Sequence, residues 1–284
     1  MRAIGVLSRF TSELVPFLKG DRRTPVVYFD KVRNVGDLLN PYLIPRITGV
    51  ETRRSKSSAF IHLRAIGSVL GSANWQSYIW GAGSIDGSPP RFRLDPRKIR
   101  AVRGVLTRDM LSNCGYPMDS VLLGDPAWLL PRYYKKRSSI NGAAYRVGIV
   151  PHFSDMERFV DKSLVPSQDC TVIDVGLDPE SFVDKVLSCD FIVSSSLHGL
   201  IIADAYDVPN AWVKFSNKLL GDEFKFRDYY STTDCPKEPA YRVAMQSDLT
   251  GLLSSISSIA TTKQFKRNAD DLLDAFPSEM KVPA

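Results

Sequence analysis

The stretch Phe191–Tyr206 reads Phe-Ile-Val-Ser-Ser-Ser-Leu-His-Gly-Leu-Ile-Ile-Ala-Asp-Ala-Tyr, and the rest of the chain is organised around it. A short apolar run, Phe191–Val193, ends at three serines. Apolar residues then recur at helical spacing, at Leu197, Leu200 and Ile201. The stretch therefore predicts a buried strand, a tight turn and a helix.

The first turn of this predicted helix carries His198, directly after Ser196 and Leu197. Free backbone N–H groups and the helix dipole at such a position favour an anion. The alternative for the serines is helix capping alone, and the alternative for a lone histidine is a structural role. The sequence leaves both alternatives open.

Length and composition indicate an ordinary globular protein with a moderate basic surplus. The chain has 284 residues, enough for two domains, and 37 lysines and arginines stand against 31 aspartates and glutamates. This surplus suits an anionic small substrate or an acidic membrane surface at least as well as nucleic acid.

The four cysteines are scattered, and no pair has the spacing of a zinc site or a redox pair. We therefore expect a reduced, cytoplasmic protein without a metal site. Residues Met1–Lys19 interrupt apolar residues with charges, which favours an amphipathic helix over a membrane anchor.

Strand-like and helix-like segments alternate twice, before and after a basic, polar stretch at Arg132–Ala144. Alternation of this kind is typical of parallel βαβ units. We predict an α/β fold of two facing Rossmann-like domains, residues 1–135 and 136–284, with helices from Asp248 to Phe276 ending the second.

Ligands of such sheets bind beyond the carboxyl ends of the strands. Of the three histidines, His152 and His198 follow strands of the second series, whereas His62 lies within an apolar run and is expected to be packed. Arg103 and Arg108 follow a strand of the first series, and each has a surface ion pair as its alternative role. Further candidates at or beyond strand ends are Asn34, Asp37, Asp125 and Lys225.

Several common motifs are absent from the sequence: the Walker loop, GxGxxG, HExxH and GxSxG. The chain therefore does not look like a P-loop enzyme, a dehydrogenase or a metallohydrolase.

Eight short motifs resemble, in order, those of the polysaccharide pyruvyltransferase family. They are Asn34–Asp37, Ile66–Ser68, Trp80–Gly83, Val102–Arg108, Leu123–Pro126, Ile149–His152, Ser194–Leu200 and Phe224–Asp228. The resemblance covers roughly residues 25 to 230 and excludes the tail.

The resemblance implies an enzyme that moves the pyruvyl group of phosphoenolpyruvate onto two hydroxyls of a hexose, forming a cyclic ketal and releasing phosphate. It also implies a fold similar to that of GT-B glycosyltransferases and no cofactor beyond the donor substrate. The implied acceptor is a glycan or a lipid-linked precursor at the inner face of the membrane, with peripheral membrane contact as one option.

By resemblance, His198 is the catalytic histidine, acting as acid or base, and the essential arginine lies in the segment from Arg103 to Arg108, with Arg108 favoured. The donor's carboxylate and phosphate need several cationic groups. The residues expected to bind substrate are Arg103, Ser196, Leu197, Lys225 and His152 around the donor, and Asn34 and Asp37 around the acceptor.

Two rival functions are compatible with the sequence. A glycosyltransferase of GT-B shape would need an acidic residue to hold a ribose, and Glu180, in a predicted first helical turn, is an unconvincing candidate. A sugar-binding protein that has lost its activity is the other rival.

Overall fold

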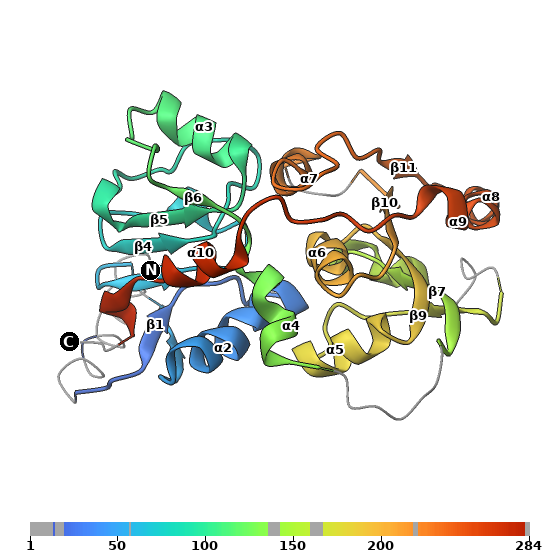
Figure 1. Ribbon diagram of the computed structural model, residues 1–284, viewed down its shortest axis with the longest axis horizontal. Coiled ribbons are helices and arrows are strands. Elements are labelled where there is room, and N and C mark those ends of the chain that lie inside the picture. Colours follow the sequence, from blue (N-terminus) through green and yellow to red (C-terminus); the bar gives the residue numbers. More distant parts are fainter. Residues whose placement is uncertain are drawn as a thin grey trace, which may run out of the picture.

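The computed structural model describes residues 14, 20–56, 58–135, 143–159, 167–217 and 221–281. It contains two α/β halves, each built on a parallel sheet, which lie side by side (Figure 1). The two-domain, Rossmann-like prediction is therefore confirmed, and the arrangement is consistent with a GT-B-like one. The amphipathic helix predicted for Met1–Lys19 lies, apart from Leu14, outside the described residues.

The first sheet has six parallel strands in the order β2-β1-β3-β4-β5-β6. Its elements are β1 (Thr24–Val26), α2 (Val35–Thr48), β2 (Thr52–Arg54), β3 (His62–Arg64), η1 (Leu70–Ser72), β4 (Ser77–Trp80), η2 (Pro96–Lys98), β5 (Ile99–Val102), α3 (Val105–Asn113), β6 (Leu122–Leu123), η3 (Pro126–Leu129) and α4 (Leu130–Tyr133).

The second sheet has five parallel strands in the order β11-β10-β9-β7-β8. Its elements are β7 (Tyr145–Val150), η4 (Phe153–Phe159), β8 (Cys170–Val172), α5 (Pro179–Val186), β9 (Cys189–Ser194), α6 (Leu197–Ala205), β10 (Asn210–Lys214), α7 (Phe224–Tyr230) and β11 (Tyr241–Arg242).

Both sheets have the same internal order, in which the third strand lies beside the first. Each sheet therefore has a switch point between its first and third strands, β1 and β3 in one half and β7 and β9 in the other. Loops leaving the carboxyl ends of strands diverge at such a point and leave room for a ligand.

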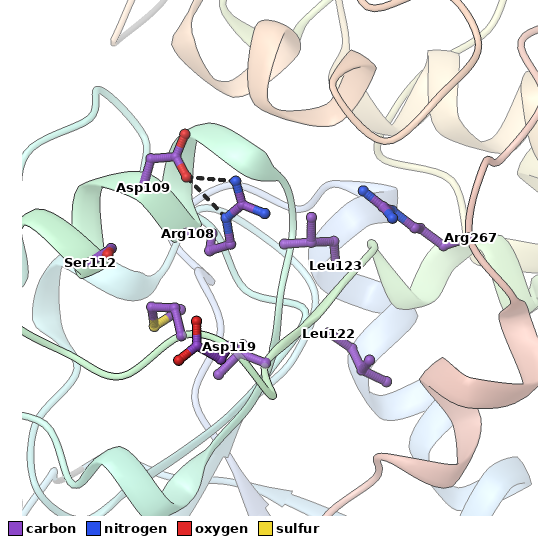
Figure 2. Close-up of a pocket in the computed structure, with 9 residues that line it drawn as sticks. Arg108, Asp109, Ser112, Asp119, Leu122, Leu123 and Arg267 are labelled. Atoms are coloured by element: carbon purple, nitrogen blue, oxygen red, sulfur yellow. Dashed lines mark hydrogen bonds and ion pairs between the residues drawn. The ribbon is translucent and has the colours of Figure 1, made fainter.

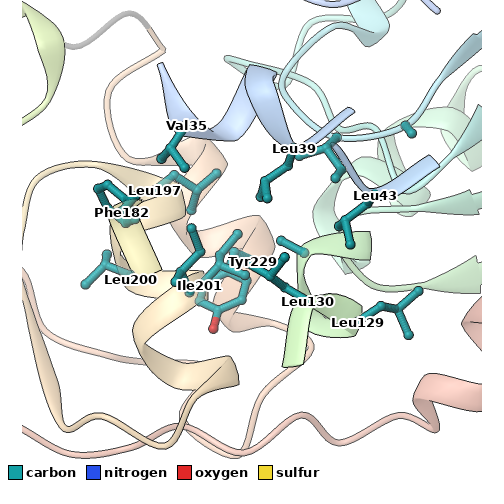
Figure 3. Close-up of a cluster of buried hydrophobic side chains, with 14 of the residues drawn as sticks. Val35, Leu39, Leu43, Leu129, Leu130, Phe182, Leu197, Leu200, Ile201 and Tyr229 are labelled. Atoms are coloured by element: carbon teal, nitrogen blue, oxygen red, sulfur yellow. The ribbon is translucent and has the colours of Figure 1, made fainter. Parts of the chain in front are cut away.

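The helix that follows the serine turn, α6, is buried on all sides because it lies between the two halves. Its residues Leu197–Asp204 are all buried, as expected for a helix that is apolar all round. Figure 3 shows Leu197, Leu200 and Ile201 of α6 in one cluster with Leu39 and Leu43 of α2. The two halves thus share a hydrophobic core, which fixes their relative position.

The C-terminal segment differs from the prediction. Helices α8 (Gln246–Ser254) and α9 (Ile256–Ile259) lie on the second half, but residues 261–268 are not helical. The chain then crosses back, and α10 (Ala269–Asp274) and η5 (Ser278–Met280) lie on the first half (Figure 1). The prediction of a helical tail from Asp248 to Phe276 is therefore wrong for residues 261–268, whereas α8, α9 and α10 account for most of the rest. The division at residue 135 stays a prediction.

This returning segment is attached to the first sheet by specific hydrogen bonds. Trp80 Nε1 donates to the Leu272 carbonyl at 2.7 Å, and Thr24 Oγ1 donates to the Met280 carbonyl at 2.8 Å. Within the described residues, none of the helices has the length and apolar character needed to cross a lipid bilayer.

Candidate functional site

A cavity of about 260 Å³ lies where the switch points of the two sheets face each other. The first half contributes the loop after β1, the start of α2 and the turn after β3. The second half contributes the turns after β7 and β9, together with α7. The lining residues include Phe29, Asn34, Asp37, Ser68, His152, Phe153, Ser196, Leu197, His198 and Lys225.

The serine turn leaves the start of α6 open toward this cavity. Ser194 Oγ accepts the Ser196 N–H at 3.0 Å, and Ser195 Oγ accepts the His152 N–H at 2.8 Å. Ser196 is the N-cap residue, but its side chain makes no capping hydrogen bond. The interpretation of the serines as side-chain caps of α6 is therefore wrong. Two of them shape the turns, and the third lines the cavity.

The first N–H groups of α6 have no intrahelical partner. Within the described residues, the first backbone hydrogen bond of this helix runs from the Leu200 N–H to the Ser196 carbonyl, at 3.3 Å. The N–H groups of Leu197 and His198 therefore remain available beside the cavity, where the helix dipole favours negative charge.

Lys225 contributes a buried ammonium group to the same cavity. Its side chain extends from α7, and the residue is only 8% exposed. Among the described residues, Lys225 Nζ makes no hydrogen bond or ion pair, and it lies 5.3 Å from the centroid of the Phe226 ring. Burial, reinforced by the nearby positive charge of Arg103, lowers the pKa of Lys225 to about 8. A buried cation without a protein partner suits an anionic ligand.

His198 extends from the first turn of α6 into the space between the halves. Its ring lies against Gly36 in α2, so closely that a Cβ atom at position 36 would come within 2.0 Å of His198 Nδ1. Any side chain at this position would displace the ring. On its other side, His198 Nε2 lies 3.6 Å from Asp125 Oδ2.

Asp37 faces these groups from the first half of the molecule. Its Oδ1 accepts the Phe29 N–H at 2.9 Å, and its Oδ2 accepts a hydrogen bond from Asn34 Nδ2. Burial raises the pKa of Asp37, although the Asn34 hydrogen bond and the charge of His198 oppose this effect. A carboxylate with a raised pKa is a better general base.

The other two histidines are poor candidates for proton transfer. Burial lowers the pKa of His152 to about 3, and the charge of Lys225 acts in the same direction. Its Nδ1 lies 2.8 Å from Ser154 Oγ. His62 is fully buried in the first sheet, as the sequence predicts, and burial lowers its pKa to about 3. Both rings are therefore neutral near pH 7.

Arg103 lies behind the cavity and is occupied by protein partners. Its guanidinium donates to Asp228 Oδ2 at 2.9 Å, to Ser68 Oγ at 2.9 Å and to the Ser84 carbonyl at 2.5 Å. The side chain is fully buried. Arg103 therefore places positive charge near the site without having a free donor face.

The structure does not bring Arg108 to this cavity. Figure 2 shows it in a separate pocket with Arg267, where it forms hydrogen bonds with Asp109 at 2.9 and 2.8 Å. The surface ion pair that the sequence left open for Arg108 is thus observed, and its catalytic role stays an untested prediction.

Seven of the nine predicted site residues meet in one cavity: Asn34, Asp37, His152, Ser196, Leu197, His198 and Lys225. Sequence reasoning assigned no role to Gly36 or Ser68, and it did not pair Asp125 with His198. The position of Asp125 at the carboxyl end of β6 was the available signal for it.

Comparisons with known proteins cover the part of the chain that contains the serine turn and α6. The family model described as polysaccharide pyruvyl transferase matches residues 93–217, which include His198. An uncharacterised protein, L143, of Acanthamoeba polyphaga mimivirus is 32% identical over 212 residues, 72% of either chain. The succinoglycan biosynthesis protein ExoV of Rhizobium meliloti is 27% identical over 150 residues, which are 51% of this chain and 44% of ExoV.

The matched region extends from the last strands of the first sheet through β10 of the second, so it contains the serine turn and α6. Together with the motif order and the two-sheet architecture, this match shows that residues 93–217 of the chain form a polysaccharide pyruvyl transferase domain, the domain of an enzyme family.

Proposed function

We propose that the protein transfers the pyruvyl group of phosphoenolpyruvate to two hydroxyls of one hexose, in a polysaccharide or its lipid-linked precursor. The product is a cyclic ketal, and phosphate is released. One observation carries the proposal: the unpaired ammonium of Lys225, the open start of α6 and His198 share one cavity between the halves.

The donor's charges suit this cavity. Phosphoenolpyruvate carries a phosphate and a carboxylate on the same carbon, and charge-assisted hydrogen bonds to such groups are strong. Lys225 supplies a free ammonium, the N–H groups of Leu197 and His198 supply donors, and the buried Arg103 adds positive potential from behind. The cavity is smaller than the roughly 300–1,000 Å³ of pockets for drug-sized ligands.

In the proposed reaction, His198 protonates the methylene carbon C3, and one sugar hydroxyl bonds to C2 while Asp37 accepts its proton. The C2–O bond to phosphate then breaks, and the second hydroxyl oxygen bonds to C2. Once His198 and Asp37 have returned to their starting states, one hydroxyl proton is in the new methyl group and the other is on the phosphate. No redox partner is required, and the absence of a metal or cofactor stays a prediction.

The acceptor's place is inferred from the opposite wall of the cavity. Phe29 and Phe153 come from different halves and are stacked, with ring centroids 6.3 Å apart. They line the cavity with Asn34 and Asp37, whose polar groups could hold hydroxyls. An apolar platform beside hydrogen-bonding groups is a common arrangement in ligand sites.

The glycosyltransferase alternative loses its candidate ribose-binding residue. Glu180 accepts hydrogen bonds from Tyr42 at 2.9 Å and from Arg46 at 3.2 Å, both on α2. It therefore lies in the contact between α2 and α5 and does not line the cavity.

The proposal is tested by incubating the protein with phosphoenolpyruvate and a panel of glucosides, galactosides and mannosides, free and lipid-linked. We expect acceptor-dependent phosphate release and a product heavier by one pyruvyl group. Thermal unfolding provides the comparison, because a ligand of the native state stabilises it. Stabilisation by nucleotide-sugars, with none by phosphoenolpyruvate, would favour the glycosyltransferase.

Donor affinity should fall as the pH rises above about 8. The ammonium of Lys225, whose pKa burial lowers to about 8, loses its proton there and with it the attraction for phosphate. The donor's charge changes little in this range, because the second pKa of a phosphate monoester is about 6. Calorimetric titration between pH 7 and 9.5 would measure the change, which approaches about tenfold per pH unit above the pKa.

The matched variant is Lys225→Arg, because a guanidinium keeps its charge over the whole range. We expect its pH profile to be flat, whereas Lys225→Met should bind weakly at every pH. If wild type and Lys225→Arg lost affinity in parallel, Lys225 would not be the titrating group.

A further inference from the structure

Two buried polar atoms face each other across the boundary between the halves, and neither has a hydrogen-bond partner. They are His198 Nε2, from the second half, and Asp125 Oδ2, from the first, 3.6 Å apart. Asp125 is fully buried and His198 is 9% exposed. Leaving two such atoms without a partner is unfavourable, so their juxtaposition requires an explanation.

The local structure fixes the direction of the carboxylate. Asp125 is the N-cap residue of η3, which packs on α6, and its Oδ1 accepts the Ala127 N–H at 3.0 Å. Oδ2 is thereby turned toward His198. A carboxylate can only accept a hydrogen bond, so the group that best satisfies Oδ2 is an N–H on Nε2.

We propose that Asp125 is a positioning residue that holds the neutral ring of His198 as the Nε2–H tautomer. The other nitrogen, Nδ1, is then the one that takes up a proton and delivers it to the substrate. This inference rests on the proposed function. It adds Asp125 as the residue that sets the protonation of the general acid, His198.

The surroundings of Nδ1, on the opposite edge of the His198 ring, are consistent with the Nε2–H tautomer. Within the described residues, His198 Nδ1 makes no hydrogen bond to protein, and its neighbour in the first turn of α2 is Gly36, which has no side chain. Asp37, the next residue, lies close enough to His198 for the two charges to interact. Nδ1 therefore lies on the edge of the ring next to the first turn of α2, where Asn34, Asp37 and His198 line the same cavity.

The distance between the two atoms is informative in itself. At 3.6 Å it exceeds the 2.7–3.2 Å of an ordinary N–H···O bond. Catalytic hydrogen bonds are often long without ligand and shorten in the substrate complex. A small rotation of the His198 side chain on ligand binding would complete the pair without moving the two halves.

The tautomer can be read directly by long-range ¹H–¹⁵N correlation of the imidazole rings, at a pH where they are neutral. The chain has three histidines, so the signals of His198 can be assigned by substitution. We expect wild type to show the proton on Nε2.

The test variant is Asp125→Asn. The side-chain carbonyl oxygen of asparagine should still accept the hydrogen bond from the Ala127 N–H. Its NH₂ group would then face His198 Nε2. Because this NH₂ group is a hydrogen-bond donor, His198 Nε2 must act as the acceptor, and the proton of the neutral ring must then lie on Nδ1. We expect the tautomer to switch and turnover to fall about 100-fold, within the range for general acid–base catalysis.

The control variant is Asp190→Asn, the same chemical change at an exposed residue near the amino end of β9. It should keep both the Nε2–H tautomer and wild-type turnover. A wild-type ring protonated on Nδ1, or an unchanged tautomer in Asp125→Asn, would overturn the proposal.

The wild-type spectrum alone decides the assignment if Asp125→Asn does not fold. The tautomer measurement also needs no substrate. If phosphoenolpyruvate proves not to be the donor while the tautomer switches as expected, the pairing stands and the proposed function fails.

Discussion

His198→Ala is expected to lower the turnover of phosphoenolpyruvate by about 10³–10⁴-fold, the upper part of the range for a lost general acid or base. The reason is that no other described histidine near the cavity can take its place. His152, whose pKa burial lowers to about 3, is neutral and therefore no acid near pH 7. Acceptor-dependent phosphate release at saturating substrate is the measurement.

Donor affinity should change much less than turnover in this variant. The groups proposed to hold phosphate and carboxylate are Lys225 and the backbone N–H groups at the start of α6, and alanine leaves both in place. Calorimetric titration of phosphoenolpyruvate should therefore give a dissociation constant close to that of wild type. A loss confined to turnover identifies an interaction made in the transition state.

His198→Gln is the matched variant, since glutamine fills similar space but cannot exchange a proton at neutral pH. We expect a loss comparable to that of alanine, with the unfolding temperature preserved. Near-normal turnover in either variant would remove His198 from the chemistry and return it to the structural role that the sequence left open.

The architecture could be predicted from the sequence because each sheet carries strong local signals. The apolar run Phe191–Val193, for example, lies within strand β9 (Cys189–Ser194), and the helix predicted after the serines is α6 (Leu197–Ala205). The rule that ligands bind beyond parallel strand ends then selected most of the cavity residues without knowledge of their contacts.

The pairing of side chains across the two halves could not be predicted, because it depends on how the sheets face each other. The sequence gives Arg103 and Arg108 the same chemistry, yet one is buried against Asp228 and the other lies at the surface beside Asp109. Nothing local to the motif indicates which of the two faces inward.

The end of the chain was mispredicted for a related reason. Residues 261–268 bridge the two halves, and their contacts are tertiary, such as that of Lys263 Nζ with the Asn210 carbonyl at 2.7 Å. Such contacts override local helix propensity. Gly36 is another case. A side chain is excluded there by the His198 ring, which is more than 150 positions away in sequence.

Asp228→Asn is expected to lower the free energy of unfolding by about 3–5 kcal/mol, the cost of removing one partner of a buried ion pair. Asp228 and Arg103 are both fully buried and join the two halves at 2.9 Å. Asp228 also accepts the N–H and the hydroxyl of Thr107, at 2.8 and 2.6 Å. Asparagine would leave the guanidinium charge uncompensated, and urea unfolding would measure the loss.

The backbones of Gly104 and Asp228 are also in close contact. A Cβ atom at position 104 would lie 1.8 Å from the Asp228 carbonyl oxygen. Helix α7 is thus held against the start of α3, and Lys225 lies on α7 one turn before Asp228. We therefore expect Asp228→Asn to weaken phosphoenolpyruvate binding as well. A merely local loss of stability would leave that affinity intact at temperatures where the variant is folded.

The control is Glu279→Gln, which breaks an ion pair of similar length, 2.8 Å, between Arg100 and Glu279. Their side chains are 39% and 44% exposed, and exposed pairs contribute about 0–1 kcal/mol. The double variant Arg103→Met with Asp228→Leu should be more stable than Asp228→Asn, because it leaves no buried charge unpaired. If Asp228→Asn and Glu279→Gln lowered the free energy of unfolding by the same amount, burial would not explain the contribution of the Arg103–Asp228 pair to stability.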